Sequence, residues 1–327
     1  MPISNFEGVP VLVTGGAGFI GSHLVDALLD RGAHVRVLDN LATGKRENLA
    51  HCLDRIELIE GDIRDAPTCD RACEGVRVIF HQAALGSVPR SMKDPATTIA
   101  VNVGGTANVF AAARDAKVQR VVYASSSSVY GDSEKLPKRE GEEGKPLSPY
   151  ALSKVMNEQL AGIFGRCFGM EFVGLRYFNV YGPRQDPDGP YAAVIPRFFR
   201  ALAAGEPPII YGDGEQSRDF TFVADAVVAN LLAAQAPAAA CAKAYNVAPG
   251  TRTTIRDLAR LGREIVGAGR DPVHEAPRRG DVRDSKADPT TAREVLGFVA
   301  ATTLTQGLRQ ARAFYLSAAP GAISERK

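Results

Sequence analysis

The sequence predicts an α/β fold, a doubly wound parallel sheet followed by a smaller C-terminal domain. Three observations predict it. Short β-branched runs alternate with longer amphipathic stretches, a glycine-rich turn joins the first run to the first stretch, and Pro and Gly become frequent near residue 180. Strand-like runs that alternate with helix-like segments are typical of βαβ units, which require parallel strands.

The strand-like runs come in a regular order along the first half of the chain. They are VLVTG at 11–15, HVRVLD at 34–39, IELIEGD at 56–62, VRVIFHQAA at 76–84, RVVYASS at 120–126 and FVGLRYFNVYGP at 172–183. Between them, SHLVDALLDRG and TANVFAAARDAKV carry apolar residues every three to four positions, the spacing of an amphipathic helix. Each crossover is therefore expected to pack a helix on the sheet.

A domain transition is expected near residue 180. There the chain passes into PRQDPDGP and then GEPPIIYGDGEQ, both rich in Pro and Gly. We predict a first domain at 1–180 and a second at 181–327. FTFVADAVVANLLAA and AYNVA, near 220–248, are expected to return to the first domain.

Composition excludes several classes of function. The 327 residues hold 39 Lys and Arg against 37 Asp and Glu, so no strong positive field attracts nucleic acid. No apolar run is long enough to span a membrane, and the start of the chain lacks the pattern of a secretion signal, so we expect a cytoplasmic protein without a membrane partner. The five cysteines are scattered without a CxxC pair, so no metal site is expected.

The glycine turn TGGAGFIG carries the first chemical prediction. Gly15 permits the tight turn, Gly18 lets backbone amides approach a pyrophosphate, and Gly21 lets the helix pack closely on the strand. Asp39 ends the next strand, where a carboxylate accepts hydrogen bonds from ribose hydroxyls and repels a 2′-phosphate. This is the pattern of a Rossmann-type domain that binds NAD in preference to NADP. The neighbours predicted to contact the same cofactor are Phe19, Ile20 and Asn40.

A tyrosine and a lysine four residues apart carry the second prediction. Tyr150 and Lys154 in SPYALSK share one face of a helix. A tyrosine can take a proton from an alcohol near neutral pH only if nearby positive charge lowers its pKa, and Lys154 together with an oxidised nicotinamide would supply that charge. Ser126, at the end of the fifth predicted strand, is placed to hydrogen-bond the same substrate oxygen. A surface pair is the alternative for a YxxxK spacing taken alone.

The ordered motifs resemble a known family, the extended short-chain dehydrogenases/reductases that act on nucleotide sugars. The resemblance runs from about residue 9 to 315 and is carried by TGGAGFIG, GDIRD, HQAA, SSSSVYG, SPYALSK, LRYFNVYGP, GDGEQSRDF and RRGDVRDS. It implies that Asp62 and Ile63 contact the adenine, Ala83 and Ala84 the cofactor phosphates, and Lys154 the nicotinamide ribose.

The same resemblance implies the substrate contacts. The family's catalytic Ser or Thr stands four residues before the tyrosine of VYG, which selects Ser126, with Ser127 and Ser128 beside it. The family grips the diphosphate of its substrate at positions that here hold Asn179, Arg218, Arg278 and Asp281. Guanidinium groups suit that role because they bind phosphate oxygens in bidentate fashion.

The reaction within the family is indicated by the serine run. Dehydratases of the family carry an acidic pair before VYG, whereas Ser127 and Ser128 stand there in this chain. The resemblance therefore implies a 4-epimerase: C4 gives a hydride to NAD, the 4-keto sugar rotates, and the hydride returns to the opposite face. Tyr150 would take and return the O4 proton while Ser126 holds the oxygen. A non-catalytic dinucleotide sensor is the alternative from another class.

The sugar is predicted from one position and one loop. In 4-epimerases the residue at Ser285, four after Asp281, faces the C2 substituent, and a small residue there leaves room for an N-acetyl group. The loop HQAALGSVPRSMKDP at 81–95, with Ser87 and Arg90, resembles that of bacterial enzymes acting on UDP-N-acetylglucosamine and its uronic acid. We predict interconversion of UDP-GlcNAc and UDP-GalNAc, with UDP-Glc also accepted. Epimerisation or decarboxylation of a uronic acid stays open, because a cation such as Arg90 can pair with a C6 carboxylate.

The resemblance also implies a homodimer. The helices near 97–116 and 150–168 correspond to the pair through which many relatives form a four-helix bundle. Apolar positions in these helices could equally face their own sheet.

Overall fold

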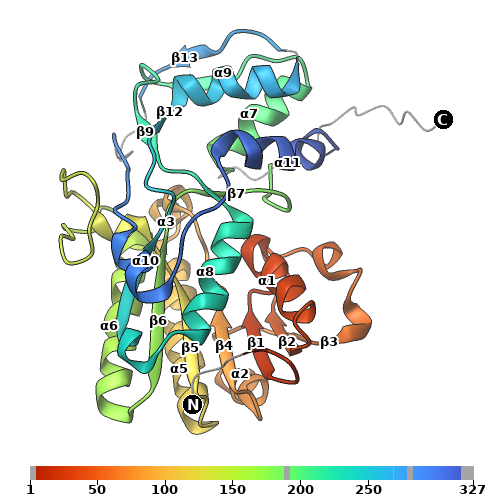
Figure 1. Ribbon diagram of the computed structural model, residues 1–327, viewed down its shortest axis with the longest axis vertical. Helices are drawn as coiled ribbons and strands as arrows, with labels where there is room; N and C mark the ends of the chain where they lie inside the picture. Colours follow the sequence, from red (N-terminus) through yellow and green to blue (C-terminus); the bar gives the residue numbers. More distant parts are fainter. Residues whose placement is uncertain (1–4, 188–191, 268, 278–282, 318–327) are drawn as a thin grey trace.

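A seven-stranded parallel sheet forms the centre of the molecule (Figure 1). The structure is a computed structural model and describes residues 5–187, 192–267, 269–277 and 283–317. The strand order is β11-β6-β5-β4-β1-β2-β3, with every neighbouring pair parallel. The strands are β1 (Pro10–Thr14), β2 (His34–Asp39), β3 (Ile56–Glu60), β4 (Val78–His81), β5 (Arg120–Ser126), β6 (Glu171–Tyr177) and β11 (Lys243–Val247). The predicted doubly wound sheet is thereby confirmed.

The sheet reverses its winding between β1 and β4. From β1 the chain first moves outward through β2 and β3, and then returns to place β4, β5 and β6 on the other side of β1. The connections that leave the carboxyl ends of β1 and β4 therefore run toward opposite edges of the sheet. They leave a crevice between them, which is the usual ligand site of such sheets.

The length predicted for the sixth strand is wrong. FVGLRYFNVYGP breaks after Tyr177, and a separate two-residue strand β7 (Val180–Tyr181) pairs with β10 (Thr221–Phe222) instead of the main sheet. Asn179 at the break has a φ of 32°, a left-handed conformation that a strand does not accommodate and that asparagine adopts more readily than most residues. The break turns the chain out of the sheet toward the cavity described below.

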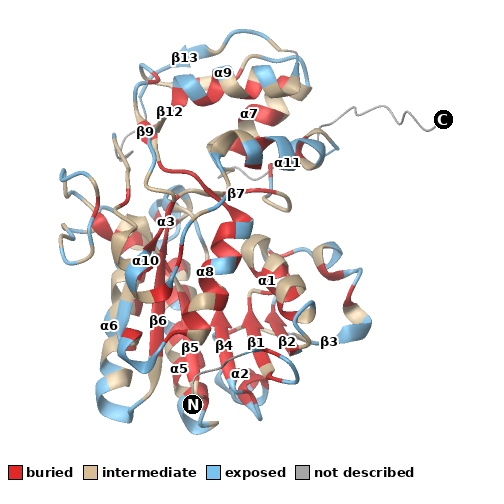
Figure 2. Cartoon of the chain, viewed as in Figure 1, coloured by how far each residue is buried: buried red, intermediate tan, exposed pale blue. Residues whose placement is uncertain are grey.

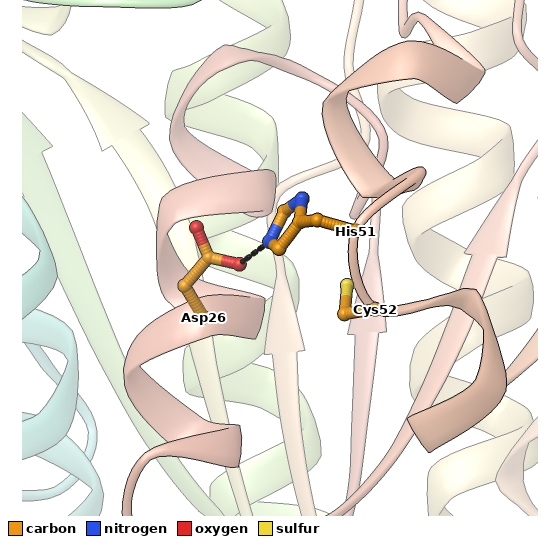
Figure 3. A group of neighbouring side chains, drawn as sticks. All are labelled: Asp26, His51 and Cys52. Carbon is orange, nitrogen blue, oxygen red and sulfur yellow. Dashed lines mark hydrogen bonds and ion pairs between the residues drawn. The ribbon is translucent and has the colours of Figure 1, made fainter.

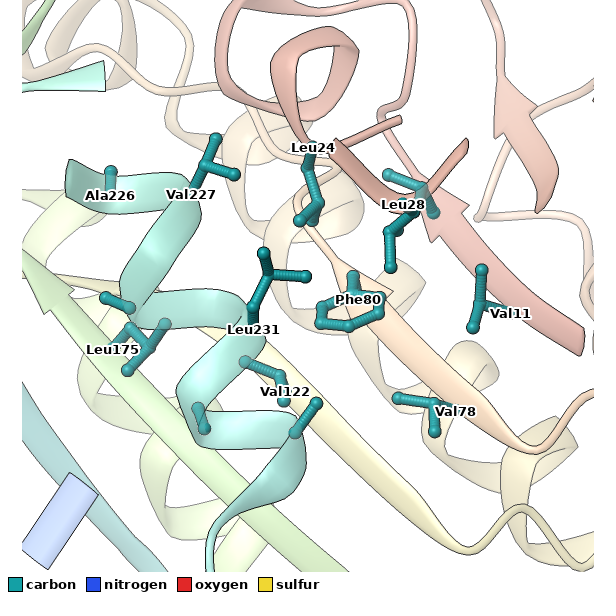
Figure 4. Close-up of a cluster of buried hydrophobic side chains, with 14 of the residues drawn as sticks. Val11, Leu24, Leu28, Val78, Phe80, Val122, Leu175, Ala226, Val227 and Leu231 are labelled. Atoms are coloured by element: carbon teal, nitrogen blue, oxygen red, sulfur yellow. The ribbon is translucent and has the colours of Figure 1, made fainter. Parts of the chain in front are cut away.

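Two helices cover one face of the sheet. They are α1 (Phe19–Leu29) and α8 (Val223–Gln235), which lie side by side. Figure 4 shows Leu24 and Leu28 of α1 and Leu231 of α8 meeting Phe80 of β4 in one buried cluster. Burial of each such side chain contributes roughly 1.5–3 kcal/mol, so this layer is a major source of stability.

Three other helices cover the opposite face: α2 (Ala66–Cys73), α5 (Thr106–Asp115) and α6 (Pro149–Phe168). The 20 residues of α6 begin where the Ser148 hydroxyl accepts a hydrogen bond from Ala151 N and Pro149 occupies the first turn. The helix ends at Gly169, whose φ of 68° is favourable for glycine. Phe110 of α5 packs on Phe172 of β6, with 4.6 Å between the ring centroids.

The segments between these layers and strands contain shorter elements. They are α3 (Val88–Lys93), α4 (Pro95–Ile99), the π-helical turn η3 (Ala100–Gly105), and the 3₁₀ turns η1 (Arg46–Leu49), η2 (Leu53–Arg55), η4 (Ser127–Tyr130) and η5 (Ala238–Ala240). The α3 helix begins at Ser87, which caps it, and α4 begins at Asp94.

A second, smaller group of elements lies at one end of the molecule, at the top of Figure 1. Its helices α7, α9 and α11 pack around Phe198, Phe199, Leu258 and Leu308. The elements of this group are α7 (Val194–Ala203), β8 (Ile209–Tyr211), β9 (Ser217–Arg218), β12 (Thr253–Thr254), α9 (Ile255–Val266), β13 (Val273–Glu275) and α11 (Leu304–Ser317). The helix α10 (Thr290–Leu296) instead packs on α8 and on β11 of the main sheet.

Segments from the second half of the chain take part in the main sheet and its helical cover. β11 pairs with β6, and α8 packs on α1, β5 and β6. The buried Arg120 fixes α8, because its guanidinium donates to the carbonyls of Ala233, Ala234 and Ala236 and pairs with Glu171. The division into 1–180 and 181–327 stays a prediction.

Buried residues concentrate in the sheet and on the inner sides of its helices (Figure 2). Within the described residues, no helix is both long enough and apolar enough to cross a membrane. All five cysteines are free, and Cys52, Cys69 and Cys73 are buried.

Candidate active site

A cavity of about 1220 Å³ runs along the carboxyl ends of the central strands. It is lined by residues that end or follow β2, β3, β4, β5 and β6, and by α1, α6 and the segment after β6. The predicted residues that line it are Gly15, Gly18, Phe19, Ile20, Gly21, Asp39, Asn40, Asp62, Ile63, Ala83, Ala84, Ser126, Ser127, Ser128, Tyr150, Lys154, Asn179, Arg218 and Ser285.

The glycine turn has no room for side chains. A Cβ on Gly15 would lie 2.7 Å from Ala83 N, and one on Gly21 only 2.1 Å from Gly15 O. Gly15 also has a φ of 69°. Gly18 begins α1 without a side-chain cap, so the first amides of the helix are left for another partner. This arrangement fits the pyrophosphate of a dinucleotide.

A carboxylate stands at the end of β2 beside this turn. The two Asp39 oxygens accept hydrogen bonds from Ala17 N and Leu41 N, at 2.9 and 2.8 Å. Burial raises the pKa of Asp39, while the two backbone hydrogen bonds oppose that rise. An oriented acceptor at this position fits the ribose hydroxyls of an adenosine.

Asp62 lies at the same end of the cavity. Arg64 pairs with the Asp62 carboxylate at 2.7 Å and Asn40 donates to it at 2.8 Å. The Arg64 guanidinium lowers the pKa of Asp62 to about 2, so this carboxylate is charged at any physiological pH. The sequence did not single out Arg64, which also lines the cavity.

The residues predicted to be catalytic meet where β5 ends and α6 begins. Ser126 is close enough to Tyr150 to lower the pKa of its phenol, and the Ser126 hydroxyl accepts a hydrogen bond from Ser128 N at 3.2 Å. The Lys154 Nζ atom lies 5.9 Å from the centroid of the Tyr150 ring and donates to the carbonyl of Ala124 at 2.8 Å. The four-residue spacing on α6 therefore places both side chains on the cavity wall beside the serine.

Burial acts on both titratable groups of this cluster. Burial lowers the pKa of Lys154 to about 8, and Glu158, one helical turn further, opposes that change. Burial raises the pKa of Tyr150, and the nearby Ser126 lowers it only in part. The protein alone thus shifts the tyrosine pKa in the opposite direction from the one the sequence predicts.

An ion-pair network lies behind the catalytic residues. Glu158 accepts from Ser125 at 2.5 Å and from the Arg176 Nη2 atom at 2.7 Å. Arg176, buried on β6, also pairs with Glu143 and donates to the Tyr130 hydroxyl. Since Ser125 is the neighbour of Ser126, the network ties the end of β5 to α6.

His81 is enclosed between two threonines. Its Nδ1 lies 2.7 Å from the Thr14 hydroxyl and its Nε2 lies 2.9 Å from the Thr106 hydroxyl. Burial, together with the nearby Lys154, lowers its pKa to about 3, so the ring stays neutral. A packing role accounts for this histidine.

The remaining predicted substrate residues divide into two groups. Arg90 belongs to α3 and Ser87 is its N-cap, and neither lines the cavity, although the neighbouring Val88 and Pro89 do. The Ser87 hydroxyl accepts from Arg90 N at 3.2 Å and thereby caps the helix. Arg278 and Asp281 lie outside the described residues.

Several lining residues were not predicted. Gln82 and Tyr177 line the cavity and are joined by a 3.2 Å hydrogen bond, and Asn230 of α8 donates to the Tyr177 hydroxyl at 2.7 Å. Gln185 and Lys138 line it as well. Gln82 and Tyr177 stand inside quoted motifs, HQAA and LRYFNVYGP, but Lys138 lies in a loop without any recognisable pattern.

One group of possible metal ligands lies away from the cavity, between α1 and the turn after η1. Figure 3 shows Asp26, His51 and Cys52, with the Asp26 carboxylate bonded to His51 at 2.7 Å. The other Asp26 oxygen is paired with Arg184 at 2.8 Å, and burial raises the pKa of the Cys52 thiol. The carboxylate is thus already shared between two protein partners.

Comparison with known proteins agrees with this geometry. The family model described as "NAD dependent epimerase/dehydratase family" matches residues 11–248. A UDP-glucose 4-epimerase of Mycolicibacterium smegmatis is 42% identical over 308 residues, which cover 93% of this chain and 97% of that protein.

Two solved structures are similar along nearly the whole chain. A UDP-N-acetylglucosamine 4-epimerase from Methanobrevibacter ruminantium, in complex with UDP-N-acetylmuramic acid, has a TM-score of 0.91 at 38% identity, and the match covers 95% of this chain and 99% of that one. A UDP-glucose 4-epimerase of Thermus thermophilus, in complex with NAD, has a TM-score of 0.86 at 35% identity, and the match covers 95% of this chain and 100% of that one.

Proposed function

Because this chain belongs to the NAD dependent epimerase/dehydratase family, we propose that it interconverts UDP-GlcNAc and UDP-GalNAc at C4. The family, the fold and the relatives establish the coarser activity: the protein is an NAD-dependent nucleotide-sugar epimerase. The choice of an N-acetylated sugar is the part proposed here.

One observation carries the proposal. Tyr150, Ser126 and Lys154 line the same cavity as the glycine turn, and Ser285 lines it too. A sugar held by its diphosphate in this cavity can therefore meet a base, a hydrogen-bonding hydroxyl and the nicotinamide end of the cofactor together. A dinucleotide sensor would need neither the base nor the hydroxyl.

In the proposed reaction Tyr150 takes the proton from O4 of the sugar and later returns it. Ser126 hydrogen-bonds the same oxygen and holds it beside the phenol, as its contact with Tyr150 allows. NAD, when bound, supplies the acceptor and later the donor of the C4 hydride, so no cofactor is consumed. Lys154 contributes positive charge at pH values below its pKa of about 8.

Burial alone opposes formation of the phenolate that would act as the base, because burial raises the pKa of Tyr150. The positive charge of Lys154, and of an oxidised nicotinamide, stabilises the phenolate and acts in the opposite direction. This dependence couples proton removal to the oxidised state of the cofactor.

Ser127 and Ser128 support epimerisation over elimination. An elimination needs an acid and a base beside the sugar, and both of these lining positions carry hydroxyl groups. The Ser128 Oγ atom is buried without a hydrogen-bond partner among the described residues, so it is available to a sugar hydroxyl.

Ser285 supports the N-acetylated sugar. Its backbone amide donates to Ser217 O at 3.1 Å, which fixes the residue on the cavity wall, and its short side chain leaves space beyond it. Arg218 lines the same region and is a candidate for the diphosphate.

The direct test is to incubate the purified protein, without added cofactor, with UDP-GlcNAc, UDP-Glc or UDP-GlcNAcA and to follow the anomeric signals by NMR. Galacto product from UDP-GlcNAc supports the proposal and shows that NAD stays bound. Product from UDP-Glc alone contradicts the proposed sugar. If nothing converts even with NAD added, the epimerase function itself is contradicted.

A homodimer through α6 is part of the proposal. Leu152 and Ile163 are exposed and stand three helical turns apart, so they share one face of α6. Light scattering should give twice the mass of one chain. A Leu152→Lys/Ile163→Lys double variant should give the monomer mass, and an unchanged dimer would place the interface elsewhere.

A further inference from the structure

One buried cation in the cavity wall has no role in the reaction described above. Lys138 lines the cavity yet is only 4% exposed. Its Nζ atom donates to the carbonyl of Ser133, its single hydrogen-bond partner among the described residues. An ammonium group has three donors, so two are left for another partner. Buried charges are costly when they are left unpaired.

Three hydrogen bonds hold the backbone of Lys138 in place. Its amide donates to Lys286 O at 2.7 Å, and its carbonyl accepts from Asp288 N and from the Asn246 side chain, each at 2.9 Å. These contacts anchor the loop next to Ser285, the residue proposed to face the sugar. The position of the lysine is therefore built into the fold and not left to a free loop.

The charges along the cavity are unevenly distributed. Among its described lining residues the carboxylates are Asp39 and Asp62, both at the adenosine end. Lys154 serves the catalytic cluster and Arg64 is paired with Asp62. At the far end Lys138 meets no carboxylate among the described lining residues. Burial lowers its pKa, and Glu134, which lies outside the wall, opposes that change.

A second unsatisfied group lies on the same wall. The Ser128 Oγ atom is buried and has no hydrogen-bond partner within the described part of the chain. A hydroxyl group of the sugar is enough to satisfy Ser128. The ammonium group of Lys138, with two free donors, is best satisfied by an anion. The diphosphate of the substrate is assigned above to Arg218, which lines the same cavity, so Lys138 is left for another anion.

We propose that Lys138 forms a subsite for a carboxylate carried by the sugar, so that the cavity accepts acidic UDP-sugars as well as neutral ones. The inference rests on the proposed function, since it assumes that a UDP-sugar occupies this cavity. In this proposal Lys138, instead of Arg90, is the cation that pairs with the carboxylate of the sugar, because Arg90 does not line the cavity.

The test compares acidic and neutral ligands in one charge-deleted variant. Lys138→Met keeps the length and apolar stem of the side chain but removes the ammonium, and Lys138→Arg keeps the charge. Lys135→Met, an exposed lysine in the same loop that pairs with Glu142, is the matched control. Calorimetry would measure the Kd of three ligands. UDP-GlcNAc has no carboxylate on its sugar, UDP-GlcNAcA carries one at C6, and UDP-N-acetylmuramic acid carries one on the ether at C3.

In Lys138→Met we expect the Kd of at least one acidic ligand to rise about 10- to 100-fold, the typical effect of losing a charge-assisted hydrogen bond, with that of UDP-GlcNAc within about threefold. Lys138→Arg should retain most of the acidic affinity and Lys135→Met all of it. Loss for UDP-GlcNAcA alone assigns the subsite to C6, and loss for the muramic acid alone assigns it to the C3 side.

Equal changes for neutral and acidic ligands would overturn the inference, as would wild-type protein that binds neither acid. Melting curves identify a variant that does not fold, in which case Lys138→Gln, with the same comparison, decides. The proposed function fails separately, if wild-type protein converts no UDP-GlcNAc while acidic binding still depends on Lys138.

Discussion

The Ser125 hydroxyl donates a hydrogen bond to the Glu158 carboxylate, with 2.5 Å between the two oxygens. Ser125 precedes the catalytic Ser126 at the end of β5, and Glu158 lies one helical turn beyond Lys154 on α6. This contact, with the Glu158–Arg176 ion pair, joins the two elements that carry the reacting groups. It fixes the spacing of serine and tyrosine and also sets the charge near the lysine.

Replacing Glu158 should therefore move the pH profile. Glu158 raises the pKa of Lys154, which burial lowers to about 8. If protonated Lys154 is required, activity is lost as pH rises through that pKa, and in Glu158→Gln the loss should begin at lower pH. We expect kcat at pH 8 to fall by roughly two- to tenfold, measured with UDP-GlcNAc between about pH 6 and 9. The exposed neighbour variant Gln159→Ala should keep the wild-type profile, and a Glu158→Gln profile of unchanged shape would argue against the coupling.

Removing the phenol of Tyr150 should abolish most catalysis without loss of cofactor. Tyr150→Phe deletes the group that exchanges the O4 proton but leaves the ring in place, so we expect kcat to fall about 10²- to 10⁴-fold. Bound NAD, measured after denaturing the protein, should match the wild type. Near-normal turnover would mean that another group is the base.

Adding one methyl group to the glycine turn should eject the cofactor. A Cβ at Gly21 would lie 2.1 Å from the carbonyl of Gly15, so Gly21→Ala must open the turn on which the pyrophosphate rests. Purified Gly21→Ala should contain little NAD and bind added NAD at least about tenfold more weakly, since a lost pair of amide hydrogen bonds costs more than about 1.4 kcal/mol. Gly104→Ala, where a Cβ meets no atom within 4 Å, should keep the wild-type NAD content. Retention of NAD by Gly21→Ala would contradict the assigned phosphate site.

Enlarging residue 285 should change the choice of sugar. Ser285→Tyr would fill the space into which we place the N-acetyl group, so kcat/KM for UDP-GlcNAc should fall about 10- to 200-fold while that for UDP-Glc falls little. Parallel NMR assays with both substrates measure the ratio. A uniform loss would indicate a distorted cavity and not a specific contact.

Deleting the Arg120 guanidinium should destabilise the fold. Arg120 is 2% exposed and satisfies three carbonyls at the end of α8 besides pairing with Glu171. Arg120→Met should reduce the free energy of unfolding by about 2–4 kcal/mol, because the buried carbonyls lose their hydrogen-bond donor. The loss is no larger because Glu171 is partly exposed and keeps some of its hydration. Urea denaturation measures the change. Arg114→Ala, which breaks an exposed pair with Asp115, should stay within about 0.5 kcal/mol of the wild type.

The parallel sheet and the chemistry of its carboxyl edge could be predicted from the sequence. Alternation of apolar runs with the periods of strand and helix is a local property, and so is the order of strand, glycine turn, helix and acid that marks Gly15, Gly18, Gly21 and Asp39. The spacing of Tyr150 and Lys154 follows from the helix alone.

The tertiary structure decided what depends on contacts between distant segments. The chain leaves the main sheet after β6, which ends at Tyr177, and Asn179 at this break has a left-handed backbone that a β-branched pattern conceals. Lys138 lines the cavity only because its loop is held by Lys286, Asp288 and Asn246, which are far away in the sequence. Likewise the link from Ser125 to Glu158, and the rise in the Tyr150 pKa, come from burial and from partners that no sequence spacing reveals. Sequence patterns record which groups share one element, whereas desolvation and cross-element hydrogen bonds exist only once the elements are packed.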